Sequence, residues 1–286
     1  MHKNIAIFSG LFLLLQATTA AAQALPGAQS PAWQAPDEVG NEPENTPSMS
    51  TVPGVSPGKF YAVGNGEGDG SSNLYSFNYS NNQIQYLTHI GETGAVLVDV
   101  AIHPVTSVLY AIDENGALYT LDKGTGARTY LGSTGRFINA LEICNGVLYG
   151  WGAFDFVAIN PANAQVTFLS HPTYGSSGDL MCDRASGTLY GIATSSGNNV
   201  LVVFNTYYGF NSYIGVTLPS TNFYGGAIDS VGQMYVAREW ICKVGWSFHP
   251  CIQLHHVDRT TGVTTRVGQS LSLYGLYGLT ITPLAW

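Results

Sequence analysis

A hydrophobic residue followed by tyrosine recurs five times along this 286-residue chain at similar spacing. Successive tyrosines are 49, 39, 41 and 45 residues apart. Periods of this length are typical of β-propellers, in which each repeat forms one four-stranded blade. The repeat therefore predicts a ring of similar sheets. The five pairs are Phe60-Tyr61, Leu109-Tyr110, Leu148-Tyr149, Leu189-Tyr190 and Met234-Tyr235.

Each copy lies among short segments of alternating apolar and polar residues, separated by Asn, Asp and Gly. Residues 109–132, LYAIDENGALYTLDKGTGARTYLG, contain three such segments in succession. Alternation with period two indicates strands, and the separating residues favour the tight turns of an antiparallel meander. We expect the Asx residue that ends the second segment of each copy to form a turn. These residues are Asn78, Asp122, Asn160, Asn205 and Asp258.

A further apolar segment precedes each Tyr motif except the first, which opens at Lys59. The chain also ends with such a segment, GLTITP at residues 278–283, that no Tyr motif follows. Pairing these two would complete one blade from both termini and remove the unpaired edges of an open ring. We therefore predict an all-β fold, a five-bladed β-propeller of four-stranded antiparallel blades. Six blades remain an alternative because the spacing is not fully regular.

The segments LYAID, LYTLD, RTTG and YLGSTG resemble those of secreted propellers of the broad NHL-like, LY-repeat type. The resemblance covers residues 58–283 and concerns the pattern of residues within each repeat. It implies architecture and leaves activity open, because propellers of this kind include both binding scaffolds and enzymes.

The N-terminus has the pattern of a signal peptide. Lys3 precedes the apolar stretch IAIFSGLFLLL, which is too short to span a bilayer, and small residues follow it up to Ala24. We expect residues 1–24 to be removed, residues 25–57, rich in proline, to be a disordered linker or pro-segment, and residues 58–286 to form the propeller. The mature protein is then secreted, or periplasmic in a bacterium, and no later segment is long enough for a membrane span.

The low charge content argues against several classes of partner. Lys and Arg number only ten, they are scattered, and the formal net charge is -8. Nucleic-acid binding requires clustered cations that neutralise phosphates, so we exclude nucleic acids and expect a monomer that binds a carbohydrate or an extracellular protein.

Two aspartates occupy matching positions in the repeat. Asp99 and Asp179 each lie eleven residues before the Tyr of their copy, and Glu142 lies nearby in the copy between them. At the mouth of a propeller channel such a pair could act as the acid and the base or nucleophile of a glycoside hydrolase. The alternative is that duplication placed both residues in a structural role.

The segment WICKVGWSFHPC, residues 240–251, is the most irregular part of the repeat region and is rich in aromatic residues. Aromatic side chains on a fixed loop can stack on sugar rings or bury apolar surface of a partner, and a lid over the channel is the alternative. We predict a disulfide between Cys242 and Cys251 that closes the loop, and a second disulfide linking neighbouring blades through Cys144 and Cys182; free thiols are the alternative for this second pair. The candidate ligand-binding residues are Trp240, Trp246, Phe248 and His249.

Two patterns raise the question of a metal. Cys242, His249, Cys251 and His255 have a spacing that matches no common zinc module, so we expect no zinc. The Gly-rich loop GNGEGDGSSN offers oxygen ligands at alternate positions, as at the start of a calcium loop, but it lacks the acidic twelfth residue. Calcium at Asn65, Glu67 and Asp69 is therefore the weaker interpretation, and no cofactor is expected.

These observations favour a secreted recognition scaffold without catalytic activity that binds a carbohydrate or an extracellular protein. A glycoside hydrolase using Asp99, Asp179 and Glu142 is the alternative. A third hypothesis is a structural propeller tethered by its linker within an extracellular assembly.

Overall fold

A computed structural model of the chain describes residues 58–65, 70–80, 83–218, 223–244, 247–271 and 274–282. The predicted signal peptide and linker, residues 1–57, lie outside these ranges. The described part consists of strands and turns, and it contains no helix long and apolar enough to cross a membrane.

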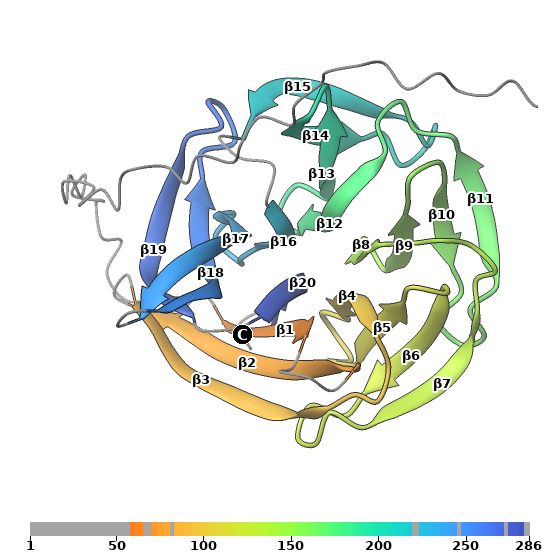
Figure 1. Cartoon of the computed structure of the whole chain (residues 1–286). Helices are drawn as coiled ribbons and strands as arrows, with labels where there is room; N and C mark the ends of the chain where they lie inside the picture. The colour runs from red at the N-terminus through yellow and green to blue at the C-terminus, as the bar shows by residue number, and fades with distance from the viewer. Residues whose placement is uncertain are drawn as a thin grey trace, which may run out of the picture. The chain divides into compact units, whose positions relative to one another are not determined.

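Twenty strands form five four-stranded antiparallel sheets arranged in a ring (Figure 1). This confirms the five-bladed β-propeller and decides against six blades. Blade 1 contains β20 (Tyr274–Ile281), β1 (Lys59–Asn65), β2 (Ser72–Ser80) and β3 (Gln83–Glu92). Blade 2 contains β4 (Leu97–Ile102), β5 (Leu109–Asp113), β6 (Ala117–Leu121) and β7 (Arg128–Ser133), and blade 3 contains β8 (Ala140–Cys144), β9 (Val147–Trp151), β10 (Phe156–Ile159) and β11 (Val166–Ser170). Blade 4 contains β12 (Ser176–Asp183), β13 (Thr188–Ser195), β14 (Asn198–Phe204) and β15 (Asn211–Thr217), and blade 5 contains β16 (Phe223–Ile228), β17 (Met234–Val244), β18 (Ser247–Val257) and β19 (Thr264–Leu271).

Blade 1 closes the ring as the repeat predicted. Its innermost strand is the C-terminal β20, which pairs with the N-terminal β1 in antiparallel register, with Tyr61 opposite Thr280. The five strands nearest the centre are β4, β8, β12, β16 and β20, whereas β3, β7, β11, β15 and β19 run along the rim (Figure 1). Because the ring is closed in this way, blade 1 is built from both ends of the repeat region.

The side chains that alternate along each strand pack on both faces of the sheet, because every blade lies between two others. Between blades 3 and 4 the Phe156 and Phe204 rings stack at 4.4 Å between centroids, and Trp151 meets Phe204 edge-on at 4.9 Å. Each of these side chains is almost fully buried. Burying an aromatic side chain of this size contributes on the order of 2–3 kcal/mol, so the interfaces between blades stabilise the ring.

The turn between the third and fourth strands has the same form in blades 2 to 5. An Asx side chain accepts hydrogen bonds from backbone N–H groups two or three residues later, and the Asx carbonyl accepts one from the fifth residue of the turn. That fifth residue has a positive φ in every case, which favours glycine. The predicted turn role of Asx is thus confirmed for Asp122, Asn160, Asn205 and Asp258, whereas Asn78 lies within β2.

The predicted link between neighbouring blades is also present. Cys144, at the end of β8, and Cys182, in β12, form a disulfide across the interface between blades 3 and 4. The structure contains no free cysteine among its described residues, and Cys251 is likewise disulfide-bonded. The side chain of Cys242 lies outside the described part, so its pairing with Cys251 stays a prediction.

Candidate functional site

The two aspartates singled out by the repeat lie at the centre of the ring. The register of each innermost strand against its neighbour places Asp99 and Asp179 at the same structural position, from blades two apart. Both side chains are 0 % exposed. The sequence therefore located the pair correctly along the chain, but the structure buries it in the interior instead of presenting it at an open channel mouth.

Small residues fill the equivalent position in the other three blades. They are Ala140, Gly225 and Gly278. A Cβ on Gly278 would lie 2.3 Å from Asp99 Oδ1 and 2.6 Å from the Asp99 Cα. Only glycine fits at position 278, because the Asp99 carboxylate occupies the space that any side chain would need.

Asp99 accepts two backbone hydrogen bonds. Val100 N–H donates to Oδ1 at 2.7 Å, and Leu141 N–H, from β8 in the next blade, donates to Oδ2 at 2.5 Å. The inner edge of each blade has no further strand to pair with, so its N–H groups need acceptors from elsewhere. The Asp99 carboxylate supplies one across the blade 2 to blade 3 boundary.

Asp179 does the same for two further blades. Its Oδ2 accepts hydrogen bonds from Gly226 N–H of β16 at 2.8 Å and from Leu279 N–H of β20 at 3.1 Å. Its Oδ1 is buried and receives no bond from any N–H or O–H group of the described residues, and the side chain is hydrogen-bonded to Asp99. The two carboxyls thus form one polar cluster that reaches all five innermost strands; we call Asp99 and Asp179 the central pair.

A hydrogen bond between two carboxyls requires a proton on one of them. Removal from water raises the pKa of Asp179 well above its usual range, and the neighbouring Asp99 charge and hydrogen bond raise it further. The pKa of Asp99 is also raised by burial, while its hydrogen bonds from Asp179, Leu141 and Val100 act to lower it. We conclude that the two carboxyls share a proton and that Asp179 is the one whose protonated form is favoured more by its surroundings.

Glu142 lies on the neighbouring β8 and is also buried. Its Oε1 accepts from Ile143 N–H at 2.7 Å, and the carboxylate accepts a second bond from the Cys182 backbone in blade 4. Burial raises the pKa of Glu142 to about 7, although the Arg184 guanidinium, with Nη2 at 3.9 Å, acts to lower it. Glu142 therefore bridges two blades next to the disulfide.

These contacts do not have the geometry of glycoside hydrolysis. That reaction needs two carboxyls roughly 5 to 9.5 Å apart, with a sugar and for inverting enzymes a water between them. In the central pair the carboxyls touch each other, both are inaccessible to solvent, and three of their four oxygens accept backbone N–H groups. The arrangement joins strands; it offers no room for a substrate.

Comparison with known proteins supports the fold alone. No family model matches the sequence, and no curated protein matches it. A solved structure described as a nidogen/laminin complex contains a chain with a TM-score of 0.55 and 12% identity, over 79% of this chain and 98% of that one. The chain has the fold of a β-propeller. A protein of unknown function from Bacteroides thetaiotaomicron is similar as well, with a TM-score of 0.51 and 15% identity over 79% of this chain and 65% of that one. The architecture implied by the repeat resemblance is thereby confirmed.

The predicted aromatic loop belongs to the β17–β18 hairpin of blade 5. Trp240 is 44 % exposed, and the Arg238 guanidinium lies 4.2 Å from the centroid of its ring. Trp246 and the side chains of Phe248 and His249 lie outside the described part of the chain, so their role as ligand-binding residues stays a prediction.

The proposed metal ligands fall largely outside the described residues too. These are Glu67, Asp69 and the side chains of Asn65, Cys242 and His249. His255 is buried in blade 5, with Nε2 3.4 Å from Gln253 Oε1. Among the residues that the structure describes, no three or more His, Cys, Asp or Glu side chains lie together so that they could hold a metal ion.

A second aromatic site escaped the sequence reasoning. In blade 4 the turn between β14 and β15 carries Tyr207, Tyr208 and Phe210, which are 86 %, 66 % and 45 % exposed. The Tyr207 and Tyr208 rings lie 4.8 Å apart edge-on, and Tyr208 and Phe210 stack at 6.1 Å. We call these three residues the tyrosine turn. The signal was present in the sequence, since the corresponding turns read DKGTGA, NPANAQ and DRTTGV where this one reads NTYYGF.

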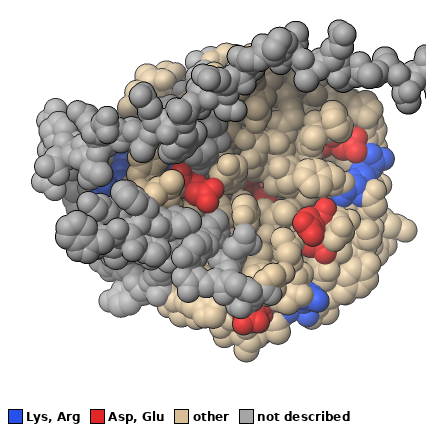
Figure 2. Space-filling model, viewed as in Figure 1, with Lys and Arg blue, Asp and Glu red and all other residues tan. Residues whose placement is uncertain are grey.

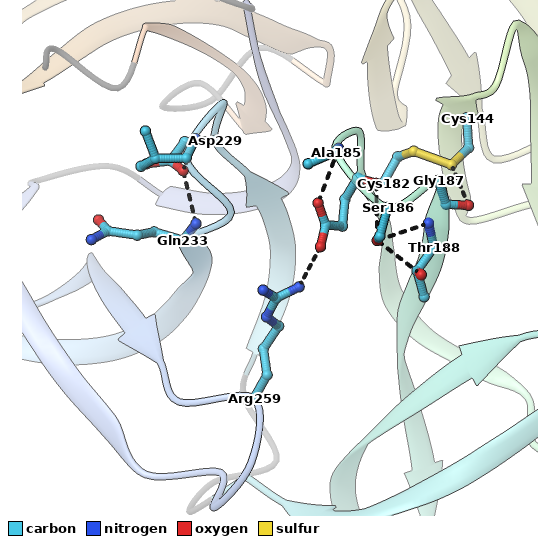
Figure 3. A network of polar contacts seen from close by, with 11 residues as sticks. Cys144, Cys182, Ala185, Ser186, Gly187, Thr188, Asp229, Gln233 and Arg259 are labelled. Atoms are coloured by element: carbon cyan, nitrogen blue, oxygen red, sulfur yellow. Dashed lines mark hydrogen bonds and ion pairs between the residues drawn. A yellow bond between two sulfur atoms is a disulfide. The ribbon is translucent and has the colours of Figure 1, made fainter.

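The tyrosine turn borders an open hollow of about 490 Å³. The β12–β13 turn forms its other side. That turn is held by an ion pair between blades, in which Arg259 Nη1 donates to Asp183 Oδ2 at 2.9 Å (Figure 3). The hollow is lined by Gly187, Thr188, Val203, Phe204, Asn205, Thr206, Tyr207, Phe210 and Ser212.

Charged groups are few and scattered on the face of the ring seen in Figure 2. Most of its described surface is neither acidic nor basic. Exposed aromatic side chains are instead a recurring feature of the described surface, among them Tyr130, Phe137, Phe154, Phe168, Tyr207, Tyr208, Phe210, Tyr213 and Trp240.

Proposed function

We propose that this protein is an exported recognition scaffold that binds carbohydrate and does not catalyse its cleavage. The observation that carries the proposal is the contrast between the two predicted kinds of site. The carboxylates that could have been catalytic are buried and bonded to backbone N–H groups, whereas several aromatic side chains on turns are exposed. Aromatic rings held on rigid turns present flat apolar faces suited to the faces of sugar rings.

Export is supported by the signal-peptide pattern of residues 1–24 and by the disulfide between Cys144 and Cys182. Disulfides form and persist mainly in oxidising compartments outside the cytosol. The location is therefore extracellular, or periplasmic in a bacterial host.

An extracellular protein is the second candidate ligand. Phe137 and Phe154 are 56 % and 78 % exposed on blade 3, and exposed aromatic side chains are frequent anchors of protein interfaces. The similarity to a chain from a nidogen/laminin complex agrees with such a use of the fold, but at 12% identity it says nothing of the partner.

One screen separates carbohydrate binding from carbohydrate cleavage. The mature protein is applied to an array of neutral and acidic glycans, and the same polysaccharides are incubated with it and examined for released reducing ends. Binding without release is expected. If reducing ends are released and Asp179→Asn abolishes their release, the hydrolase hypothesis is correct. If no glycan retains the protein, carbohydrate recognition is refuted.

A further inference from the structure

The tyrosine turn differs from its counterparts in composition but not in backbone structure. Asn205 Oδ1 accepts hydrogen bonds from Tyr207 N–H at 3.1 Å and Tyr208 N–H at 3.0 Å, and Gly209 N–H donates to the Asn205 carbonyl at 2.7 Å. In blade 5 the same three bonds connect Asp258 with Thr260, Thr261 and Gly262, at 2.8, 3.2 and 2.8 Å.

The aromatic rings are therefore not needed to form the turn. The bonds to Asn205 that define the turn involve only the backbone and the Asx side chain, and they form with threonine as well as with tyrosine at these positions. In blade 5 Thr261 adds one bond, because its Oγ1 accepts from Val263 N–H at 3.3 Å. Exposing two tyrosines and a phenylalanine also carries a cost, because apolar surface is left in water. A role in the folded turn does not explain them, and a role in contact with a ligand does.

The lining of the adjacent hollow narrows the chemistry of that ligand. Apolar surface comes from Val203, Phe204, Tyr207 and Phe210. Side chains that can exchange hydrogen bonds come from Thr188, Thr206 and Ser212. No Lys, Arg, Asp or Glu is among the lining residues in the described part of the chain. The charges of Arg259 and Asp183, at the β12–β13 turn, are already paired with each other at 2.9 Å. A charged ligand would find no counter-charge in such a site.

We infer that the tyrosine turn and its hollow form a binding site for an uncharged carbohydrate. The tyrosine rings would stack on the apolar faces of sugar rings, and the hydroxyl groups of the hollow would bond to sugar hydroxyls. This inference rests on the proposed function and deepens it, since it assigns the site to blade 4 and the ligand to neutral glycans.

The test uses ladders of two to six sugar units: uncharged cello-, xylo-, manno- and chito-oligosaccharides, and an acidic oligogalacturonate ladder. Binding of each ladder is measured by calorimetry for the mature protein, for the double variant Y207A/Y208A and for the matched control T260A/T261A. Both double variants keep the Asx acceptor and the backbone N–H groups of their turn, so both should fold, which thermal unfolding checks.

We expect at least one uncharged ladder to bind, with a loss of about tenfold or more in affinity in Y207A/Y208A and none in T260A/T261A. The variant Y207F/Y208F should retain most of the affinity, because the ring faces are kept. Binding of an uncharged ladder that Y207A/Y208A leaves unchanged would overturn the site assignment while the proposed function stands. Binding of the acidic ladder alone would overturn the ligand class, and binding of no ladder would overturn both proposals.

Discussion

Replacing Asp179 tests the interpretation of the central pair most directly. Asp179→Asn keeps Oδ2 as acceptor for Gly226 and Leu279 and supplies an amide N–H that can donate to Asp99 in place of the shared proton. Every hydrogen bond of the pair can then be made without a titrating proton. Asp179→Ala instead leaves two buried backbone N–H groups unpaired, which costs about 1–3 kcal/mol each, or roughly 2–6 kcal/mol in total.

The pH dependence gives the sharper result. The pKa of Asp179 is higher in the folded protein than in the unfolded chain, so the folded state holds one extra proton once the pH exceeds the unfolded pKa. The free energy of unfolding must then fall by about 1.4 kcal/mol for each unit of rising pH, until the folded pKa is passed. Between pH 5 and pH 7 the free energy of unfolding of the wild type should therefore fall more steeply than that of Asp179→Asn.

Urea unfolding at pH 5, 6 and 7 measures this difference. Glu92→Gln, a substitution at an exposed carboxyl on β3, serves as the control and should follow the wild type. Equal pH dependence in the wild type and in Asp179→Asn would show that no proton is held between the two carboxyls. Equal damage by Asp179→Asn and Asp179→Ala would show that the backbone acceptors are not what Asp179 provides.

Three further substitutions probe the centre of the ring. Between pH 4.5 and pH 7 the free energy of unfolding of Glu142→Gln should fall by about 3 kcal/mol less than that of the wild type, because a carboxyl with a pKa of about 7 is protonated in the folded state at lower pH. The same pH profile for both proteins in urea unfolding would contradict this. The double variant Cys144→Ser/Cys182→Ser should lower stability by at most about 4 kcal/mol, the chain-entropy value for a 38-residue separation, as measured by thermal unfolding under oxidising conditions; an unchanged melting curve would contradict a stabilising role of this disulfide. Gly278→Ala should prevent folding or cost more than about 3 kcal/mol, because its Cβ would overlap backbone and carboxylate atoms. Gly124→Ala is the control and should be tolerated, because its Cβ would meet only a side-chain oxygen at 3.4 Å; similar circular dichroism melting curves for the two variants would contradict the packing argument.

The sequence predicted the architecture because the features that define it are local and repeated. Alternation gave the strands, Asx and Gly gave the turns, and the unmatched segments at Lys59 and at residues 278–283 gave the closing blade. The first two signals depend on neighbouring residues only, and the third on comparing copies of the repeat within the chain, so one sequence was sufficient to read them.

The central pair could be found in the sequence but not understood there. Equal spacing from the Tyr motif located Asp99 and Asp179. Whether two such carboxyls line a channel or touch each other depends on how closely five strands approach, and that is set by residues far apart in the chain. Gly278, 179 residues after Asp99, is the clearest example, since its missing side chain is what allows the carboxylate into the centre.

The tyrosine turn differs from the central pair, because its signal in the sequence was local and was nevertheless overlooked. A repeat makes departures from itself informative, since positions that agree between copies serve the framework that all copies share. Tyr207 and Tyr208 depart from small and polar residues, although the backbone N–H bonds to the Asx side chain form with tyrosine as they do with threonine. The Asx and Gly residues shared by the turns of blades 2, 4 and 5 form the framework of those turns, whereas aromatic residues found only in blade 4 lie exposed beside a hollow. In these turns, agreement between repeats therefore marks structure, and disagreement marks the surface on which recognition should be sought.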